Sequence, residues 1–449
     1  MKQVKRRTLL VLLLVAGLVL GIVLFGAAYL THGGKWAAFS ANDHVYKDGH
    51  LSAGQILDRN GKVLYNAETG SYAEDWITRI STLHAVGDPY NNISTSARAA
   101  MADRLVGFDP ILGTTGGGNK LYLSIDAGLN EMAYGLLAGH KGAISIYNYR
   151  TGKMLCMVSA PTFDPANLPE IRDGDSQYEG VYLNRVFSST FTPGSVFKVV
   201  TTAAALENID GILDRTFTCT GSLEIGDGLI TCTSAHGEMD LRGAFANSCN
   251  CVYAQLSMEL GGEILQEYAE KAGLLDNFKV SGITTAAGSF DIGESYDLGW
   301  SGVGQYNDLV NPCGMMTLMG AIARGGTPVL PRLVEKERTA TGLPLLTAGR
   351  KTGSGTFDRK TCDTLKDMMA NNVAVTYGQS NFGDLKVCAK SGTAEVGSGA
   401  PHSWFVGFVD DSSCPLAFAV LVENGGSGAA VAGSFAAQLL QYAAENGIK

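Results

Sequence analysis

In the middle of the 449-residue chain runs the heptapeptide Thr192-Pro193-Gly194-Ser195-Val196-Phe197-Lys198. Proline is favoured where helices begin, so residues 193–207 are predicted to form a helix with Ser195 in its first turn. Lys198 lies three positions later and shares the helix face of Ser195. A serine hydroxyl becomes a nucleophile when a base takes its proton, and a lysine whose pKa is lowered by burial can be that base. The pair therefore predicts a nucleophilic serine, although a Ser-x-x-Lys tetrapeptide alone also occurs by chance.

A second hydroxyl lies in Ser248-Cys249-Asn250, within the predicted helical segment 244–260. A hydroxyl and an amide two residues apart can point into one cleft, where Ser248 would relay a proton and Asn250 would hold a substrate amide. The alternative is an ordinary helix cap. Cys249 between them is either a reactive thiol or a buried one, and burial is preferred because free cysteine usually packs as a small hydrophobe.

The third motif is Lys390-Ser391-Gly392-Thr393, which directly follows the predicted strand 384–389. On an edge strand beside a cleft, Lys390 would present a fixed positive charge and Gly392 would let a substrate backbone approach. The hydroxyls of Ser391 and Thr393 can hold a carboxylate. The alternative is a surface turn. A similar tripeptide at 351–353 has no strand before it and is interpreted as a loop.

The order S-x-x-K, S-x-N and K-[ST]-G is typical of penicillin-recognising serine enzymes. Residues 119–449 resemble the transpeptidase domain of class B penicillin-binding proteins, in particular the compact PbpA-like group. The resemblance extends beyond the three motifs. Its further segments are Phe163 to Ala166, Asn184-Arg185, Gly304-Gln305 through Asn311-Pro312, and Ser403 to Phe408.

This resemblance implies an α+β fold of the penicillin-binding and serine β-lactamase type. Strand patterns lie at both ends of the segment and helical patterns between them, which indicates an antiparallel sheet with helices on its faces and a helical insertion. By resemblance, Ser195 is the acylated nucleophile and Lys198 its base, while Ser248, Asn250 and Lys390 relay the proton and orient the site. Ser391, Gly392 and Thr393 would bind substrate, and the N–H groups of Ser195 and Thr393 would form the oxyanion hole.

The implied reaction is acyl transfer from D-Ala-D-Ala stem peptides of peptidoglycan, inhibited by β-lactams, without metal or organic cofactor. Two alternatives stay open: a DD-carboxypeptidase or serine β-lactamase, and a non-catalytic envelope scaffold or β-lactam sensor with the same fold. The isoleucine-rich strand near the N-terminus reads Ala53-Gly54-Gln55-Ile56 and lacks the arginine usual in the class. The role in division, elongation or sporulation is therefore left open.

The N-terminus predicts a single membrane anchor. Lys2, Lys5, Arg6 and Arg7 precede an uncharged run from Thr8 to Thr31, and about twenty apolar residues cross a bilayer. A cleaved signal peptide is the alternative, but its apolar region is usually shorter. The expected order is a cytoplasmic tail at 1–8, an anchor at 9–30, a small pedestal domain at 31–118, which ends in the Gly-rich segment 113–118, and the transpeptidase domain outside the cell. By analogy, a SEDS-type glycan polymerase is an expected membrane partner.

The net charge of −9 argues against a nucleic-acid partner. Nine cysteines leave at least one unpaired. Cys219 and Cys232 flank a predicted hairpin, where a disulfide is slightly favoured over two free thiols. The cysteines and the seven histidines show no C-x-x-C or H-E-x-x-H grouping, so no metal site is expected.

Overall fold

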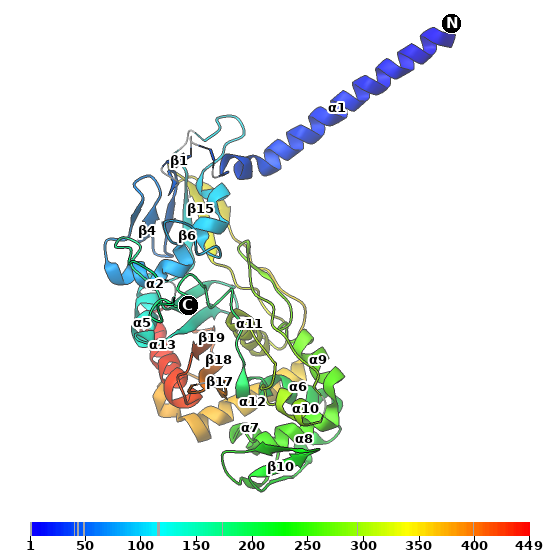
Figure 1. The fold of residues 1–449 in the computed structure, drawn as a ribbon, viewed down its shortest axis with the longest axis vertical. Coiled ribbons are helices and arrows are strands. Elements are labelled where there is room, and N and C mark those ends of the chain that lie inside the picture. Colours follow the sequence, from blue (N-terminus) through cyan, green and yellow to red (C-terminus); the bar gives the residue numbers. More distant parts are fainter. Residues whose placement is uncertain are drawn as a thin grey trace.

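The structure is a computed structural model that describes residues 2–39, 41–42, 45–47, 50–114, 117–172, 174–293, 295–397 and 399–449. A long N-terminal helix projects away from an elongated body (Figure 1). Six-stranded and five-stranded sheets lie in the upper and middle parts of that body, and a group of helices and small hairpins forms the lower end.

The five-stranded sheet has the order β17-β18-β19-β7-β8, and every neighbouring pair is antiparallel. Both ends of the predicted transpeptidase segment contribute strands, which confirms the expected sheet. α5 and α13 pack in the apolar cluster on one face, and α11 packs against β18, β19 and β7. The bounds are β7 (Gly142–Asn148), β8 (Met154–Ala160), β17 (Val387–Ala394), β18 (His402–Val409), β19 (Leu416–Val422), α5 (Ala127–Leu137), α11 (Pro312–Ala323) and α13 (Gly433–Glu445).

Helices and short hairpins lie between these strands in sequence, as the predicted insertion requires. The helices are α6 (Lys198–Asn208), α7 (Leu241–Ala246), α8 (Asn250–Leu260), α9 (Gly262–Lys271), α10 (Tyr296–Ser301) and α12 (Arg359–Asn372). The short strands are β9 (Phe217–Cys219), β10 (Ser222–Ile225), β11 (Gly228–Thr231), β12 (Gly237–Met239), β13 (Lys279–Val280) and β14 (Ile283–Thr284). Short helical turns add η1 (Gly194–Val196), η2 (Ile212–Asp214), η3 (Val373–Tyr377), η4 (Gln379–Phe382) and η5 (Gly428–Ala432).

Two predicted helices differ from the structure near the motifs. The predicted helix 193–207 begins as the 3-10 turn η1, and the regular α6 starts only at Lys198. The predicted helix 244–260 is two helices, α7 and α8, because Ser248 between them has a positive φ of 52° that an α-helix cannot contain.

The six-stranded sheet has the order β16-β15-β6-β3-β4-β5. β3 and β6 are parallel, and strands from both sides of the predicted boundary at 118 lie in this sheet. β15 and β16 come from far along the chain and were not predicted. The bounds are β3 (Gln55–Leu57), β4 (Val63–Asn66), β5 (Ser71–Tyr72), β6 (Asn119–Leu123), β15 (Val334–Thr339) and β16 (Pro344–Thr347). The remaining N-terminal elements are β1 (Tyr46–Lys47), β2 (His50–Leu51), α2 (Trp76–Val86), α3 (Ala97–Ala100) and α4 (Ala102–Leu105).

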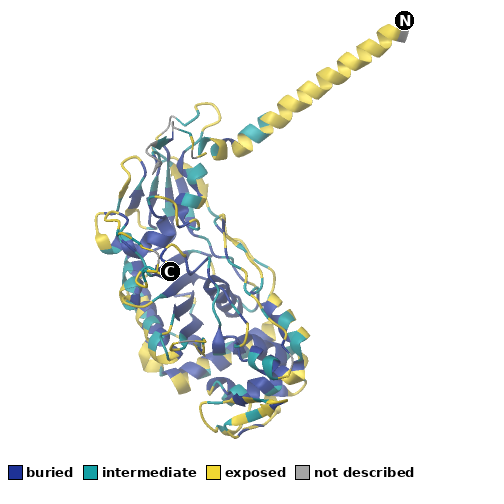
Figure 2. Cartoon of the chain, in the orientation of Figure 1, coloured by how far each residue is buried: buried dark blue, intermediate teal, exposed yellow. Residues whose placement is uncertain are grey.

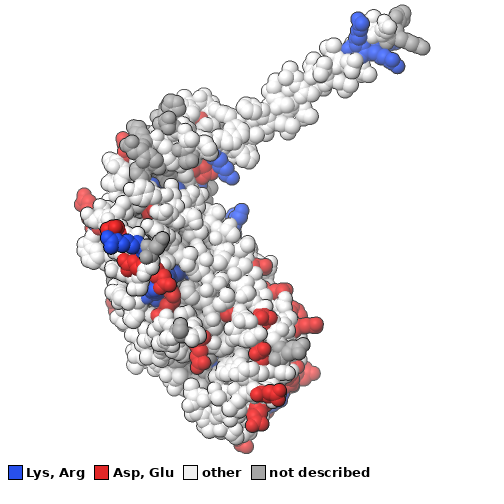
Figure 3. Space-filling model, in the orientation of Figure 1, with Lys and Arg blue, Asp and Glu red and all other residues white. Residues whose placement is uncertain are grey.

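Helix α1 (Lys2–Ala37) contains the predicted anchor, and residues Gln3–Ala37 are long and apolar enough to cross a membrane. Figure 2 shows that its side chains are exposed along nearly its whole length. Figure 3 places basic side chains at its free end and a long uncharged surface behind them. At the other end, Tyr29 Oη donates to the Pro110 carbonyl at 3.1 Å. An exposed apolar surface of this length fits a lipid environment.

Asp126 links a helix that packs on the five-stranded sheet to a turn of the six-stranded sheet. It caps α5 and also contacts the turn between β3 and β4. Its carboxylate accepts the Leu129 N–H at 3.0 Å and the Asn60 side-chain amide at 2.9 Å. We expect Asp126→Ala to lower the free energy of unfolding by about 1 kcal/mol, the usual cost of losing an N-cap. Urea unfolding of the detergent-solubilised chain measures this. Asp227→Ala, in the exposed turn between β10 and β11, is the control, and an equal loss there would contradict the prediction.

Candidate active site

The turn that carries Ser195 is held from three sides. Gly194 adopts a positive φ of 56°, and a Cβ there would lie 2.9 Å from the Ala394 Cα of β17. The Gly194 N–H donates to the Gly304 carbonyl at 2.7 Å. The buried Trp404 of β18 donates its indole N–H to the Thr192 carbonyl at 3.0 Å. Ser195 itself is partly exposed, so the turn presents the hydroxyl-bearing residue at a surface.

Lys198 is the first residue of α6, and its side chain is fully buried. Its Nζ donates to the Ser248 carbonyl at 2.6 Å, to Asn250 Oδ1 at 2.7 Å and to Ser248 Oγ at 3.1 Å. In the part of the chain that the structure describes, Lys198 Nζ and Ser195 Oγ are not hydrogen-bonded to each other. Burial lowers the pKa of Lys198 to about 7, and negative charge on nearby thiols such as Cys232 opposes this shift. A large fraction of this amine is therefore neutral near pH 7.

Ser248 lies in the sharp connection between α7 and α8. Its positive φ is rare for a residue with a side chain, and the following residue, Cys249, is the N-cap of α8. Asn250, the first residue of α8, is fixed by its amide, which donates to the Thr231 carbonyl at 2.8 Å. This local backbone, which is costly in isolation, directs both motif side chains toward Lys198.

Lys390 lies in the edge strand β17 and is fully buried. Its Nζ donates to Ser248 Oγ at 3.0 Å and to the Ser391 carbonyl at 2.9 Å. Burial and, to a smaller extent, the charge of Lys198 lower the pKa of Lys390 well below its usual value. Ser248 Oγ therefore contacts two lysines that come from segments far apart in the sequence.

The rest of the third motif lines the free edge of β17. The Ser391 N–H donates to Tyr377 Oη at 2.8 Å, and that hydroxyl in turn donates to Ser391 Oγ at 3.0 Å. Alternate N–H groups of a strand point the same way, so the Thr393 N–H also points away from β18 toward the edge. A Cβ on Gly392 would lie 2.9 Å from the Pro193 carbonyl. Glycine at this position thus lets β17 pack against the Ser195 turn, and its predicted contact with substrate stays a prediction.

A cleft of about 360 Å³ brings the three motifs together. Among the described residues that line it are five of the eight predicted site residues, whereas Lys198 and Lys390 lie buried beside it. The lining residues from the motifs are Ser195, Ser248, Asn250, Ser391 and Thr393.

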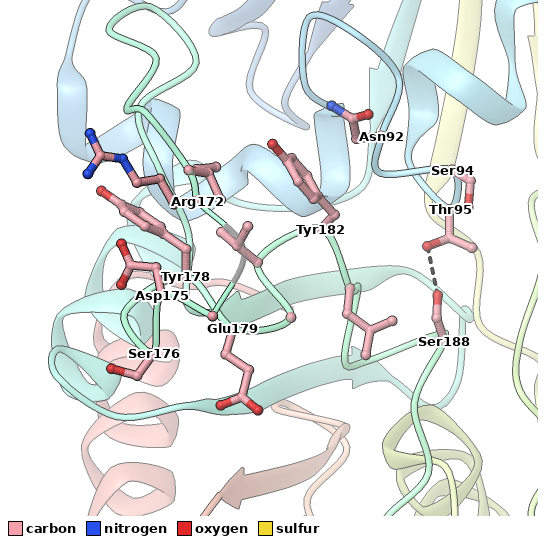
Figure 4. Close-up of a pocket in the computed structure, with 15 residues that line it drawn as sticks. Asn92, Ser94, Thr95, Arg172, Asp175, Ser176, Tyr178, Glu179, Tyr182 and Ser188 are labelled. Carbon is pink, nitrogen blue, oxygen red and sulfur yellow. Dashed lines mark hydrogen bonds between the residues drawn. The ribbon is translucent and has the colours of Figure 1, made fainter.

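A larger cavity of about 670 Å³ lies elsewhere, between residues 92–95 and residues 171–188. Figure 4 shows polar side chains among its lining residues, including Thr95 and Ser188, which are joined by a hydrogen bond. It holds no motif residue, so its size does not make it the candidate active site.

Some cleft residues were not predicted. Tyr377 supports Ser391 from η3, and Trp300 of α10 lines the cleft together with Cys232. These residues are brought in by the tertiary fold, and no local motif marks them. The side-chain amide of Gln305 pairs with the backbone of Glu395. The amide oxygen accepts the Glu395 N–H at 3.0 Å, and the amide nitrogen donates to the Glu395 carbonyl at 3.3 Å. Gln305 had been noted as part of the family resemblance.

The expected disulfide between Cys219 and Cys232 is wrong, since all nine cysteines are free thiols. The two thiols lie near each other, but each has another side-chain neighbour. Cys232 Sγ is 3.6 Å from Cys249 Sγ, and Cys219 Sγ is 3.5 Å from His236 Nδ1. Lys351, the alternative lysine motif, is exposed and outside any named strand, as predicted.

Comparisons with known proteins agree with this architecture. Residues 142–441 match the family model described as penicillin binding protein transpeptidase domain. The chain is 30% identical over 353 residues to peptidoglycan D,D-transpeptidase PbpA of Mycolicibacterium smegmatis, covering 73% of this chain and 70% of the relative. Penicillin-binding protein A of M. tuberculosis, solved as a penicillin G acyl-enzyme, has a TM-score of 0.76 at 24% identity, covering 88% and 99% of the two chains. A D,D-transpeptidase domain from Eggerthella lenta has a TM-score of 0.74 at 25% identity, covering 88% and 98%.

The α+β fold and its motif-lined cleft define a serine acyltransferase of the penicillin-recognising class. Within that class, the chain belongs to the penicillin-binding protein transpeptidase family, and both the fold class and the family resemblance are confirmed.

Gly392 offers a test of how strand β17 supports the Ser195 turn. We expect Gly392→Ala to destabilise the protein by about 1–3 kcal/mol, because the new methyl group would press on Pro193 and Val196, and to slow acylation by fluorescent penicillin. Urea unfolding and gel fluorescence measure the two effects. Gly397→Ala, where a Cβ meets open space, is the matched control. Wild-type stability and labelling in Gly392→Ala would contradict the argument.

Proposed function

We propose that this chain cross-links peptidoglycan as a D,D-transpeptidase and is inhibited by β-lactams that acylate Ser195. The observation that carries the proposal is the contact of Lys198 and Lys390 with one oxygen, Ser248 Oγ, beside the cleft that contains Ser195. Relatives named D,D-transpeptidase and a related fold solved as a penicillin G acyl-enzyme support it.

In the acylation step, Ser195 Oγ attacks the carbonyl carbon of the penultimate D-Ala and its proton passes to neutral Lys198. The C–N bond to the terminal D-Ala then breaks, and the leaving amine receives a proton through Ser248. With a β-lactam, the same step opens the ring and the nitrogen stays attached. The buried position of Lys198 supports its role as base, since the lowered pKa leaves the amine able to accept a proton.

The oxyanion that forms during this step would be bound by the backbone N–H groups of Ser195 and Thr393. The free edge of β17 supports this assignment, because its outward N–H groups point toward the cleft. Ser391 and Thr393 would hold the substrate carboxylate, Gly392 would border the substrate, and Asn250 would bind the substrate amide. Lys390 supports the proton relay by its contact with Ser248.

In the second half-reaction, an amine from a neighbouring stem peptide attacks the ester carbon of the acyl-enzyme. The amine loses a proton to the relay, Ser195 Oγ regains one, and a peptide cross-link is released. This transfer requires that the acyl-enzyme outlive attack by water, which distinguishes a transpeptidase from a carboxypeptidase or a β-lactamase.

The chain is anchored in the membrane by α1, and we propose that its N-terminus is cytoplasmic and its catalytic region outside the cell. The basic residues that precede the apolar run support this orientation. Residues 31–118 would act as a pedestal for the transpeptidase region. A penicillin-binding protein 2 solved with MreC and a peptidoglycan synthase complex have related folds, which supports a membrane protein partner, here a SEDS-type polymerase.

Intact-mass measurement after benzylpenicillin tests the nucleophile. We expect the wild-type chain to gain the mass of one ring-opened penicillin and to keep it for many minutes, whereas Ser195→Ala gains none. Lys351→Ala, in the exposed loop with the similar tripeptide, should behave as wild type. Rapid loss of the adduct would favour a hydrolase, and no adduct on the wild type would contradict the proposal.

The pH dependence of acylation tests Lys198 as the base. Its pKa of about 7 means that the neutral form rises from roughly a tenth at pH 6 to roughly nine tenths at pH 8, so the acylation rate constant should rise about tenfold. Lys390, the other lysine at this site, also has a lowered pKa, and its Nζ contacts the same Ser248 Oγ as Lys198 Nζ does. Stopped-flow fluorescence with labelled penicillin gives the profile. A rate that falls with pH over this range would exclude a neutral lysine base.

A further inference from the structure

Four potential metal ligands meet beside the S-x-N motif. The thiols of Cys219, Cys232 and Cys249 and a ring nitrogen of His236 all lie within 4.8 Å of one another. Cys232 Sγ and Cys249 Sγ are 3.6 Å apart, and Cys219 Sγ is 3.5 Å from His236 Nδ1. In a tetrahedral zinc site with Zn–S bonds of about 2.3 Å, two ligand sulfurs are about 3.8 Å apart. Two of the separations are thus close to the edge of a zinc coordination tetrahedron, and the others, at most 4.8 Å, would need only small side-chain movements to match it.

From this geometry we propose that Cys219, Cys232, His236 and Cys249 bind a structural zinc ion. Three thiols and one imidazole are a usual donor set for structural zinc, because soft thiolates and imidazole both suit this metal. The distance of 3.6 Å between Cys232 Sγ and Cys249 Sγ is far beyond that of a covalent disulfide, and all the thiols are free, so they are available as ligands.

The backbone is arranged to present these ligands from three elements. The antiparallel pairing of β9 with β12 brings Cys219 next to Gly237, and His236 directly precedes that residue. Cys232 follows the β10–β11 hairpin, and Cys249 caps α8. The Cys251 N–H donates to Cys232 Sγ at 3.3 Å, an outer-shell contact that favours a thiolate.

The segment that carries the ligands reaches the main core through Phe217 and Cys219 of β9, whereas β10 and β11 rest on a smaller apolar cluster. Residues 217–239 form two separate two-stranded sheets, and such hairpins are marginal without a core or a cross-link. The apolar cluster beneath β10 and β11 contains Ile225, Ile230 and Ala254, with a few partly buried neighbours. A metal ion that joins this segment to α8 would stabilise it, because metal binding adds directly to folding stability.

The zinc ion would also fix the catalytic motif, because Cys249 is the residue between Ser248 and Asn250. Lys198 Nζ bonds groups of both flanking residues, and Ser248 needs an uncommon positive φ to make these contacts. Cys232 moreover lines the candidate cleft. The four ligands are positioning residues: they hold Ser248 and Asn250 in place without touching the reacting atoms.

This cluster differs from the expectation, based on short motifs, that the chain has no metal site. The ligands are spaced thirteen, four and thirteen residues apart (219 to 232, 232 to 236, 236 to 249), and the short C-x-x-C and H-E-x-x-H patterns do not describe such spacing. The expectation that no metal is needed for the chemistry is not altered, since the proposed ion supports the fold of the motif.

The test is metal analysis of the full-length chain purified in detergent and reconstituted with Zn²⁺ alone. We expect about one zinc per chain in the wild type, and loss of it in Cys219→Ser and His236→Gln. Cys414→Ser, a cysteine outside the cluster, should retain the metal. Circular dichroism verifies that each variant is folded. Reconstitution with Co²⁺ should give the intense visible absorption of tetrahedral thiolate ligation in the wild type, so the readout does not depend on any one variant.

Two outcomes would overturn the proposal: a reduced, folded wild type that binds no zinc, or peptide mapping that finds a Cys232–Cys249 disulfide in the native protein. Acylation by labelled penicillin is the second readout, and it rests on the proposed function. Removing zinc with a chelator should slow it at least tenfold, with recovery when Zn²⁺ is returned. Because metal content is measured independently, failure of acylation in the zinc-loaded wild type would count against the proposed function and leave the metal site standing.

Discussion

Lys198 and Lys390 are almost two hundred positions apart in the chain, yet both place Nζ within about 3.1 Å of Ser248 Oγ inside a buried region. Burial disfavours the charged form of both amines, and charge on Lys198 further lowers the pKa of Lys390, so the arrangement needs compensation from fixed acceptors. The carbonyls of Ser248 and Ser391 and the amide oxygen of Asn250 supply it. Three features of the fold bring these groups together: the break between α7 and α8 places Ser248, the start of α6 places Lys198, and the buried strand β17 places Lys390.

Much of this architecture could be predicted because the signals are local. Strand patterns at both ends of residues 119–449 predicted the central antiparallel sheet, and helical patterns between them predicted the insertion. The three motifs could be joined because their order is typical of one enzyme class, and the cleft contains five of their residues. The net charge of −9 also argues, from the sequence alone, against a nucleic-acid-binding protein.

What the sequence did not predict depends on register and on long-range contact. The helix 244–260 looked continuous, since nothing in its composition marks Ser248 as a residue with positive φ. Neither β15 nor β16 alternates apolar and polar residues as a half-buried strand does: β15 has a single apolar residue, Val334, and β16 is a short, exposed Pro-Leu-Leu-Thr. The predicted cysteine pair failed for a related reason: Cys249 and His236 reach the two thiols through the tertiary fold, and no local pattern marks these contacts.

The mixed six-stranded sheet has a practical consequence for work on the catalytic region alone. β6 lies between β3 and β15, and a fragment that begins at residue 119 would lack β3, β4 and β5. The row of backbone groups on β6 that now pairs with β3 would be open to solvent, and an open, apolar strand edge promotes aggregation between molecules. A well-behaved fragment should therefore start directly after α1, so that β1 to β5 are kept and the sheet retains its natural border.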